Sequence, residues 1–273
     1  MTGIEHLYQT FTMLKKRQEK ALITYLVAGD PDLKATARHI EVMAQAGADV
    51  IELGIPFSDP SADGPVIQRA SARALSKGTH SANILQMVSE VRQRVTIPLI
   101  FMSYYNPILQ YGLTQFCQDA AQAGVDGVII PDLPVEEAGP LATVALSKGL
   151  AVIPLAAPTS TRQRLAKIAA LAQGFIYCVT VTGITGTKQV VTGEINGLTR
   201  QIKEFTELPV VAGFGIATPE QAIAVAQHCD GVVVGSALVR LIEELGENSP
   251  QAVADLTRQL KEALTMEYIG APG

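Results

Sequence analysis

Three carboxylates stand at positions in the chain where acid and base chemistry could be carried out. Glu52 lies between apolar neighbours in an extended apolar run. Asp63 lies in the Pro- and Asp-rich segment 56–65, and Asp132 ends a later apolar run. Because successive residues of a strand point to opposite faces, Glu52 can face an interior while its neighbours pack outward. A carboxylate in such an interior is costly unless it has a partner or a chemical task.

Each carboxylate also has a purely structural interpretation. Glu52 could belong to a buried ion pair, and Asp63 precedes Gly64 as turn residues often do. Asp132 could equally be the N-cap of a helix expected at 135–148. The long acidic loop that directly follows the Glu52 run favours a catalytic interpretation for Glu52 and Asp63 together, whereas both interpretations of Asp132 stay open.

Glycine-rich segments follow three later apolar runs and predict a phosphate site. They are 182–186, 213–216 and 235–236, the last of which leads into a short helical stretch at 237–244. Glycine lets backbone N–H groups approach an anion closely, and a helix N-terminus favours negative charge. Turns need glycine in any case, but three such segments at adjacent strand ends favour phosphate binding. Lys188 is the one obvious cation nearby in the sequence, so amides and the helix end are expected to bind the phosphate.

Other chemistries lack their side chains at the expected positions. The lysines fall in predicted helices or loops, so a Schiff-base lysine on a strand is not expected. The four histidines fall away from the strand ends where a metal would be bound, so no metal site is expected. Three cysteines without a C-x-x-C pattern predict neither a disulfide framework nor a thiolate site. What remains is carboxylate chemistry on a phosphorylated substrate, which must supply any electron sink itself.

Eight β-type runs alternate with helical segments, and these elements must position the candidate residues. Strands that are apolar on both faces and alternate with helices indicate a parallel sheet covered by helices. Eight such units predict a (β/α)8 barrel, a fold of about 250 residues with its chemistry at the carboxyl ends of the strands. The expected strands are 21–29, 49–57, 98–106, 127–132, 151–157, 175–181, 209–216 and 231–236, and the expected helices are 33–46, 64–77, 82–94, 114–123, 135–148, 161–172, 194–205 and 218–227.

The two ends of the chain complete this α/β architecture. Residues 1–19 are expected to form an extra N-terminal helix that closes the bottom of the barrel, and 249–266 a final packing helix, so that 1–273 is one TIM-barrel domain. The alternative fold is an open doubly wound sheet, which would carry G-x-G-x-x-G after its first strand. The chain has Ala28-Gly29-Asp30-Pro31 there instead.

Composition excludes several classes of protein. The net charge is −5 and the basic residues are scattered, which does not suit a nucleic-acid or membrane-surface binder. The apolar runs are much shorter than the ~20 residues of a transmembrane helix, and the N-terminus has no signal-peptide core. These features, with reduced core thiols, predict a cytoplasmic protein that acts on a small molecule.

The segment E-L-G-I-P-F-S-D-P-S-A-D-G-P at 52–65, with P-V-E-E at 134–137 and G-F-G-I at 213–216, resembles the signature of the tryptophan synthase α subunit family. The resemblance covers nearly the full chain in order, and the first segment is far more specific than barrel geometry requires. It implies a lyase of L-tryptophan biosynthesis, which cleaves indole-3-glycerol phosphate by a retro-aldol reaction to indole and glyceraldehyde 3-phosphate. The indole ring would then be the substrate's own electron sink.

The resemblance also implies roles for individual residues. Glu52 matches the general acid and base, Asp63 the carboxylate that binds the indole N–H, and Tyr177 the tyrosine beside the catalytic glutamate. Tyr25 stands where a ring stacks on indole, and Thr185 matches a threonine of a loop that closes over the site. The matching phosphate-binding residues are Gly186, Gly215, Gly235 and Ser236.

A partner is implied in the same way. Members of the family pair with a pyridoxal-phosphate-dependent β subunit in an α2β2 heterotetramer, so this chain is expected to have no cofactor or metal of its own. The matching partner-facing residues are Pro56, Asp59, Tyr104 and Asn106. Two rival functions stay open: a free-standing indole-3-glycerol-phosphate lyase that needs no partner, and an inactive barrel that serves only as a binding subunit.

Overall fold

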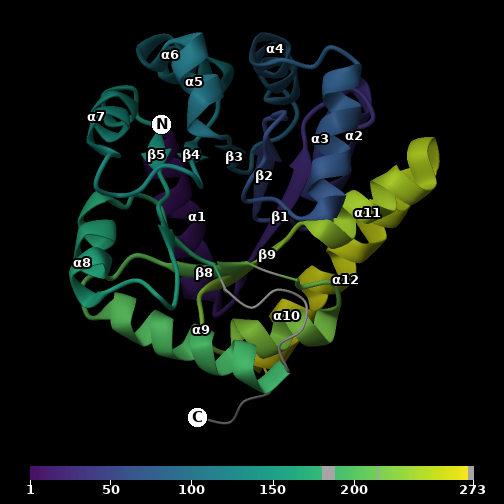
Figure 1. Ribbon diagram of the computed structural model, residues 1–273. Helices are drawn as coiled ribbons and strands as arrows, with labels where there is room; N and C mark the ends of the chain where they lie inside the picture. The colour runs from purple at the N-terminus through teal and green to yellow at the C-terminus, as the bar shows by residue number, and fades with distance from the viewer. Residues whose placement is uncertain (180–187, 214, 270–273) are drawn as a thin grey trace.

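The computed structural model describes residues 1–179, 188–213 and 215–269, and its strands form a closed parallel barrel (Figure 1). The described strands form one nine-stranded sheet in the order β5-β4-β3-β2-β1-β9-β8-β7-β6. Its edge strands β5 and β6 are successive pieces of one segment, bonded to β4 on one side and to β7 on the other. The sheet therefore closes into the (β/α)8 TIM barrel that the sequence predicts. The strands are β1 Ala21–Val27, β2 Val50–Gly54, β3 Leu99–Met102, β4 Gly127–Ile129, β5 Ala151–Val152, β6 Leu155–Ala156, β7 Ile176–Val179, β8 Val210–Gly213 and β9 Gly231–Val234.

The helices surround this barrel, apart from α1, which lies across its centre in Figure 1. Pro65 opens α3 at a position where its missing N–H is not needed, so the loop that contains Asp63 ends at a fixed point. The helices are α1 Gly3–Arg17, α2 Leu33–Gln45, α3 Pro65–Ser76, α4 Ser81–Val91, α5 Tyr105–Tyr111, α6 Leu113–Ala123, α7 Gly139–Ser147, α8 Arg162–Leu171, α9 Lys188–Lys203, α10 Pro219–Ala226, α11 Ser236–Leu245 and α12 Ser249–Ile269, with a 3-10 turn at Gly246–Asn248.

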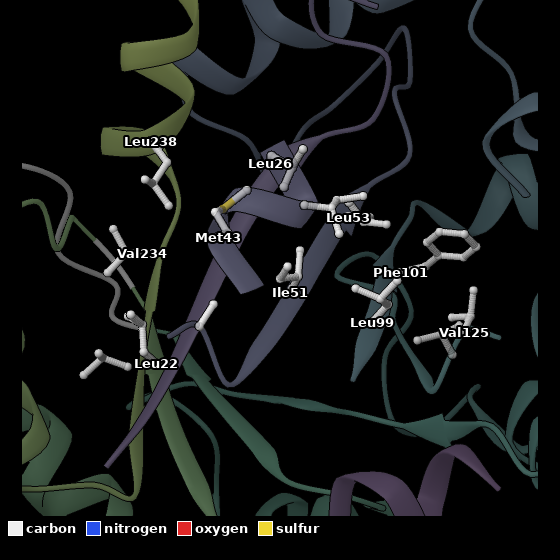
Figure 2. Close-up of a cluster of buried hydrophobic side chains, with 14 of the residues drawn as sticks. Leu22, Leu26, Met43, Ile51, Leu53, Leu99, Phe101, Val125, Val234 and Leu238 are labelled. Carbon is white, nitrogen blue, oxygen red and sulfur yellow. The ribbon is translucent and has the colours of Figure 1, made fainter. Parts of the chain in front are cut away.

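The alternation of side chains along the strands produces two separate cores. Ile51 and Leu53 point outward into a large cluster between the strands and the helices, which Figure 2 shows together with Met43 of α2. Tyr25 and Val50 point inward, into a smaller cluster inside the barrel. Glu52 lies between Ile51 and Leu53 in sequence, so it points to the inside, as its apolar neighbours predict.

Helix α1 closes the bottom of the barrel, as expected. Leu7, Phe11 and Leu14 of α1 are buried in the inner cluster. The ring of Phe11 lies 5.5 Å from that of Phe175, which immediately precedes β7. Because the amino ends of the strands are covered in this way, an open end of the barrel is left only where the strands terminate and the loops begin.

Several predicted boundaries differ from those of the structure, among them the start of the helix expected at 194–205, which already begins at Lys188. The fifth run is not one strand, since the parallel ladder is interrupted at Pro154, which has no N–H to donate. The third run ends at Met102 instead of residue 106, because Tyr105 already starts a helix whose first turn accommodates Pro107. The helix expected at 135–148 begins only at Gly139.

Within the residues that the structure describes, none of the helices is both long and apolar enough to cross a membrane.

Candidate active site

Glu52 lies inside the open end of the barrel, near the end of β2. In the strand register it stands between Tyr25 of β1 and Ile100 of β3. Its side chain is only 1% exposed, and its Oε2 has no hydrogen-bond partner among the described residues. Burial, and then the nearby charge of Asp63, raise the pKa of Glu52 to about 8. Glu52 is therefore a buried acid that holds its proton at neutral pH, and no cation among the described residues is paired with it.

Asp63 provides the second carboxylate, from the loop between β2 and α3. Burial raises the pKa of Asp63 to about 6, although the hydroxyl of Tyr104 partly opposes that shift. At neutral pH Asp63 is therefore mainly ionised while Glu52 is mainly protonated. Two neighbouring carboxyl groups whose environments separate their pKa values are suited to different roles in one reaction.

Tyr104 holds the Asp63 loop in place from the segment that follows β3. Its hydroxyl donates to Oδ2 of Asp63 at 3.2 Å and accepts the N–H of Ala62 at 2.8 Å. Its ring lies 5.3 Å from that of Phe57, at the start of the same loop. Tyr104 was expected on a partner-facing surface, but its side chain is only 4% exposed. Sequence reasoning missed this contact because the phenol and the loop are far apart in the chain.

The other expected partner-facing residues differ in accessibility. Pro56 is buried at the base of the Asp63 loop, whereas Asp59 is exposed on that loop and Asn106 is exposed in the first turn of α5. The hydroxyl of Ser58 donates to Oδ2 of Asp59 at 2.5 Å. Asp59 and Asn106 thus present polar groups on the outer side of the mouth, and their role toward a partner stays a prediction.

The rings of Tyr25 and Tyr177 lie beside the carboxyl groups, and each ring requires a glycine on the neighbouring strand. A Cβ at Gly54 would lie 2.2 Å from the hydroxyl of Tyr25, and one at Gly213 would lie 2.2 Å from the hydroxyl of Tyr177. Burial is the main cause that raises the pKa of both phenols, and the charge of Glu52 adds to it in each case. The structure thus brings both rings close to Glu52.

The expected phosphate site is partly within the described residues. Ser236 is exposed as the first residue of α11, and the N-cap residue Gly235 has no side chain to cap that helix N-terminus. The backbone N–H groups of such a helix N-terminus suit an anion. Gly215 has a φ of +64° with open space around its Cβ direction, so glycine is required there for its backbone conformation. Thr185 and Gly186 lie outside the described residues.

Gly235 has a different reason to be glycine. A Cβ at this position would lie 3.2 Å from the Cβ and ring of Tyr25. Its lack of a side chain therefore allows the tyrosine to sit beside the start of α11. Tyr25 and the expected phosphate site are therefore in direct contact at Gly235.

Asp132 has a role that neither sequence interpretation anticipated. Its Oδ1 accepts the backbone N–H of Tyr105 at 2.9 Å, so it caps α5 from the neighbouring loop. The helix after Asp132 starts too far along the chain to be capped by it, since α7 begins at Gly139. Asp132 therefore fixes the start of α5, immediately after Tyr104.

Other candidate polar groups have the following positions in the described part of the chain. There, no group of three or more His, Cys, Asp or Glu side chains is arranged to bind a metal ion. His39 is buried, with its Nε2 2.8 Å from the hydroxyl oxygen of Ser249, and His80 caps α4. The described strands contain no lysine.

A cavity of about 290 Å³ adjoins this site on the side of α7 and α8. Its lining includes Pro131, Leu155 and Val179 but neither Glu52 nor Asp63. Leu155 pairs with Tyr177 in the strand register, so the cavity shares a wall with the mouth.

Sequence comparisons identify relatives along nearly the whole chain. The family model described as "Tryptophan synthase alpha chain" matches residues 11–267. The tryptophan synthase alpha chain of Carboxydothermus hydrogenoformans is 51% identical over 240 residues, which cover 88% of this chain and 90% of that protein. That of Geobacter sulfurreducens is 50% identical over 260 residues, which cover 93% and 97% of the two chains.

Solved structures agree with these sequence matches. The tryptophan synthase alpha chain from Legionella pneumophila superposes with a TM-score of 0.88 at 39% identity and covers 100% of both chains. A chain of tryptophan synthase from M. tuberculosis, in an open form with BRD0059 bound, gives 0.86 at 34% identity and covers 95% of this chain and 98% of that one. With its barrel and its paired mouth carboxyl groups, this chain belongs to the tryptophan synthase α chain family.

Proposed function

We propose that this chain cleaves indole-3-glycerol phosphate to indole and glyceraldehyde 3-phosphate, as a lyase of tryptophan biosynthesis. The observation that carries the proposal is the pair of Glu52 and Asp63. One carboxyl group is buried and protonated at neutral pH, and its neighbour is ionised. Retro-aldol cleavage with an indole electron sink needs one group that exchanges protons and one fixed negative charge.

In the proposed reaction, Glu52 first donates its proton to C3 of the indole ring. The ring nitrogen then carries positive charge, which the carboxylate of Asp63 stabilises through the N–H. The ionised Glu52 next removes the proton of the glycerol hydroxyl beside the ring. The carbon–carbon bond breaks, its electrons return to the ring, and indole and the aldehyde form. Glu52 loses one proton and regains one, so a single residue suffices as acid and base.

Binding of the substrate phosphate is proposed at the N-terminus of α11, with Gly215, Gly235 and Ser236. The backbone N–H groups of Ser236 and its neighbours, which the N-cap Gly235 has no side chain to cap, supply the attraction together with the helix dipole. Gly186 and Thr185 are proposed to complete this end of the site. The rings of Tyr25 and Tyr177 are proposed to flank the indole, since both are held beside Glu52.

A β subunit is the proposed partner, in an α2β2 assembly, and the pyridoxal phosphate is proposed to belong to that subunit. Asp59 is exposed on the loop that carries Asp63, and Asn106 is exposed in the first turn of α5, two residues after Tyr104, whose hydroxyl donates to Asp63. A partner that docks there would stabilise the ordered loop and so raise the population of the active form. Indole would then pass to the partner.

The test is an indole-release assay on the isolated chain, repeated while a β subunit is titrated in. We expect slow release from the isolated chain and a large increase on addition of the partner. Full activity that is unchanged by the partner would favour the free-standing lyase. Absence of release under both conditions, with the partner still bound, would favour the inactive binding subunit.

A further inference from the structure

A charged network joins three segments at the edge of the mouth. The guanidinium of Arg73 donates to both oxygens of Asp30, at 2.8 Å each, and to Oε1 of Glu243 at 2.7 Å. Arg69, one turn earlier on α3, also donates to both oxygens of Glu243, at 2.8 and 2.7 Å. Arg73 is therefore the residue that bridges a carboxylate of the loop after β1 and a carboxylate of α11.

The Asp30 side of this bridge is buried. The Asp30 side chain is only 2% exposed, while that of Arg69 is half exposed. A buried carboxylate that loses its cation is left uncompensated, whereas an exposed ion pair is screened by water and contributes little. The network thus depends mainly on Arg73, and Arg69 is a secondary contact.

Two of the three linked segments, α3 and α11, lie next to the groups that would bind the two ends of the proposed substrate. Helix α3 begins at Pro65, directly after the Asp63 loop, and α11 begins at Ser236, where the phosphate is proposed to bind. Both helices pack against β1, because Ala70 of α3 and Val239 of α11 are buried in the same inner cluster as Tyr25. The ionic bridge adds a directional link between the two helices to these apolar contacts.

From this geometry we propose that Arg73 is a positioning residue. It fixes α3 relative to α11, and so keeps the distance between Asp63 and the phosphate site that a substrate bound at both must span. This inference rests on the proposed function, since it assumes a phosphorylated substrate that reaches Asp63. A shift of about 1 Å between groups that hold one substrate can reduce a rate about a hundredfold.

The experiment compares Arg73→Gln with Arg92→Gln. Arg92 also pairs with a mostly buried aspartate, Asp126, but at the bottom of the barrel, away from both ends of the substrate. Two kinetic constants are measured for each variant: kcat/KM for indole-3-glycerol phosphate, and the inhibition constant of inorganic phosphate, which probes the α11 end alone. Thermal unfolding is recorded so that activity is compared where each variant is fully folded.

We expect Arg73→Gln to lower kcat/KM about tenfold to a hundredfold and to leave the inhibition constant of phosphate within about twofold, because each end of the site is locally intact. Arg92→Gln is expected to lower the Tm and leave both constants unchanged. Arg73→Lys should lie between wild type and Arg73→Gln, since an ammonium cannot donate in a fork to Asp30 and reach Glu243 as well.

Two results would overturn the inference. One is a kcat/KM for Arg73→Gln no lower than that of Arg92→Gln. The other is phosphate inhibition that weakens in step with kcat/KM, which would mean that the damage lies at the α11 end itself. The wild-type protein and Glu52→Gln are assayed in parallel. A wild type without cleavage activity refutes the proposed function, whereas normal cleavage in both wild type and Arg73→Gln refutes only the positioning role.

Discussion

The two ends of this barrel differ in how they compensate a buried carboxyl group. At the bottom, Asp126 accepts from Arg92, from His6 at 2.9 Å and from the N–H of Leu99 at 2.8 Å. At the mouth, Glu52 is also buried, yet its Oε2 has no hydrogen-bond partner in the described part of the chain, and the nearby charge of Asp63 raises its pKa further.

This difference separates structural from chemical roles. Asp126 links α1, the start of β3 and the start of β4, so its charge is compensated and serves stability. Glu52 is left without compensation, which is unfavourable for folding but keeps its proton available for transfer. A buried carboxyl group that is left unpaired at a cost in stability is a candidate for function. Asp126 shows that this fold can pair a buried carboxyl group elsewhere.

The largest expected effect follows from Glu52→Gln. The amide preserves size but cannot exchange a proton, so we expect kcat to fall about a hundredfold to ten-thousandfold with near-normal substrate binding. Turnover by quench-flow or steady-state indole release measures the loss, and inhibition by a phosphate-bearing analogue measures binding. Retention of more than half of the wild-type turnover would remove Glu52 from the mechanism.

The same variant should also change how stability depends on pH. The folded-state pKa of Glu52, about 8, lies above its ordinary value of 4.5. Wild-type stability should therefore fall as pH rises from about 4.5 through about 8, because the unfolded chain ionises first. Glu52→Gln lacks this loss and should become progressively more stable than wild type over that range. Urea unfolding at several pH values measures the difference, and parallel curves for the two proteins would contradict it.

At the bottom of the barrel, Asp126→Asn should lower the stability of the protein without lowering its activity. It leaves the charge of Arg92 without its buried partner, and we expect a loss of the order of 3 kcal/mol in the free energy of unfolding. Activity per folded molecule should stay at the wild-type level, since the change lies at the opposite end from Glu52. Urea unfolding and kcat/KM on the same preparation test this, and a selective loss of activity would break the proposed division between the two ends.

Tyr104→Phe should have a smaller effect at the mouth. It removes the hydroxyl that donates to Asp63 and accepts from Ala62. A hydrogen bond to a charged group is worth about 1.5 kcal/mol, so we expect kcat/KM to fall about tenfold at pH 7. Because that hydrogen bond lowers the pKa of Asp63, the acid limb of the rate profile should move to higher pH. An unchanged profile would show that Tyr104 does not act on Asp63.

Most of the fold could be predicted from the sequence because its signals are local. Apolar runs, helical periodicity and the G-A-D and G-V-D junctions that begin at Gly47 and Gly124 mark most strands and helices without reference to the rest of the chain. The interruption at Pro154 and the whole of helix α5 were missed, because a run of apolar residues does not reveal where its backbone hydrogen bonds stop.

The site was only partly predictable. Glu52 could be placed inside the barrel by strand alternation, and its neighbour Asp63 by the unusual loop. The contacts of Tyr104 with Asp63, of Asp132 with Tyr105, and of Arg73 with Asp30 join segments that are distant in sequence. No local pattern specifies such pairs, so they become visible only when the strands are arranged around the barrel.

The most direct test of the account is the pH dependence of kcat/KM in the wild-type protein. Glu52, with a pKa of about 8, must hold its proton at the start of the reaction, and Asp63, with a pKa of about 6, must be ionised. We therefore predict a bell-shaped profile with limbs near pH 6 and pH 8. The second ionisation of a substrate phosphate, near 6, also contributes to the acid limb, so the alkaline limb is decisive. A decline in kcat/KM of about tenfold per pH unit above 8 is the predicted result, and a rate that stays constant through pH 9.5 would contradict a protonated, uncompensated Glu52 as the acid of this site.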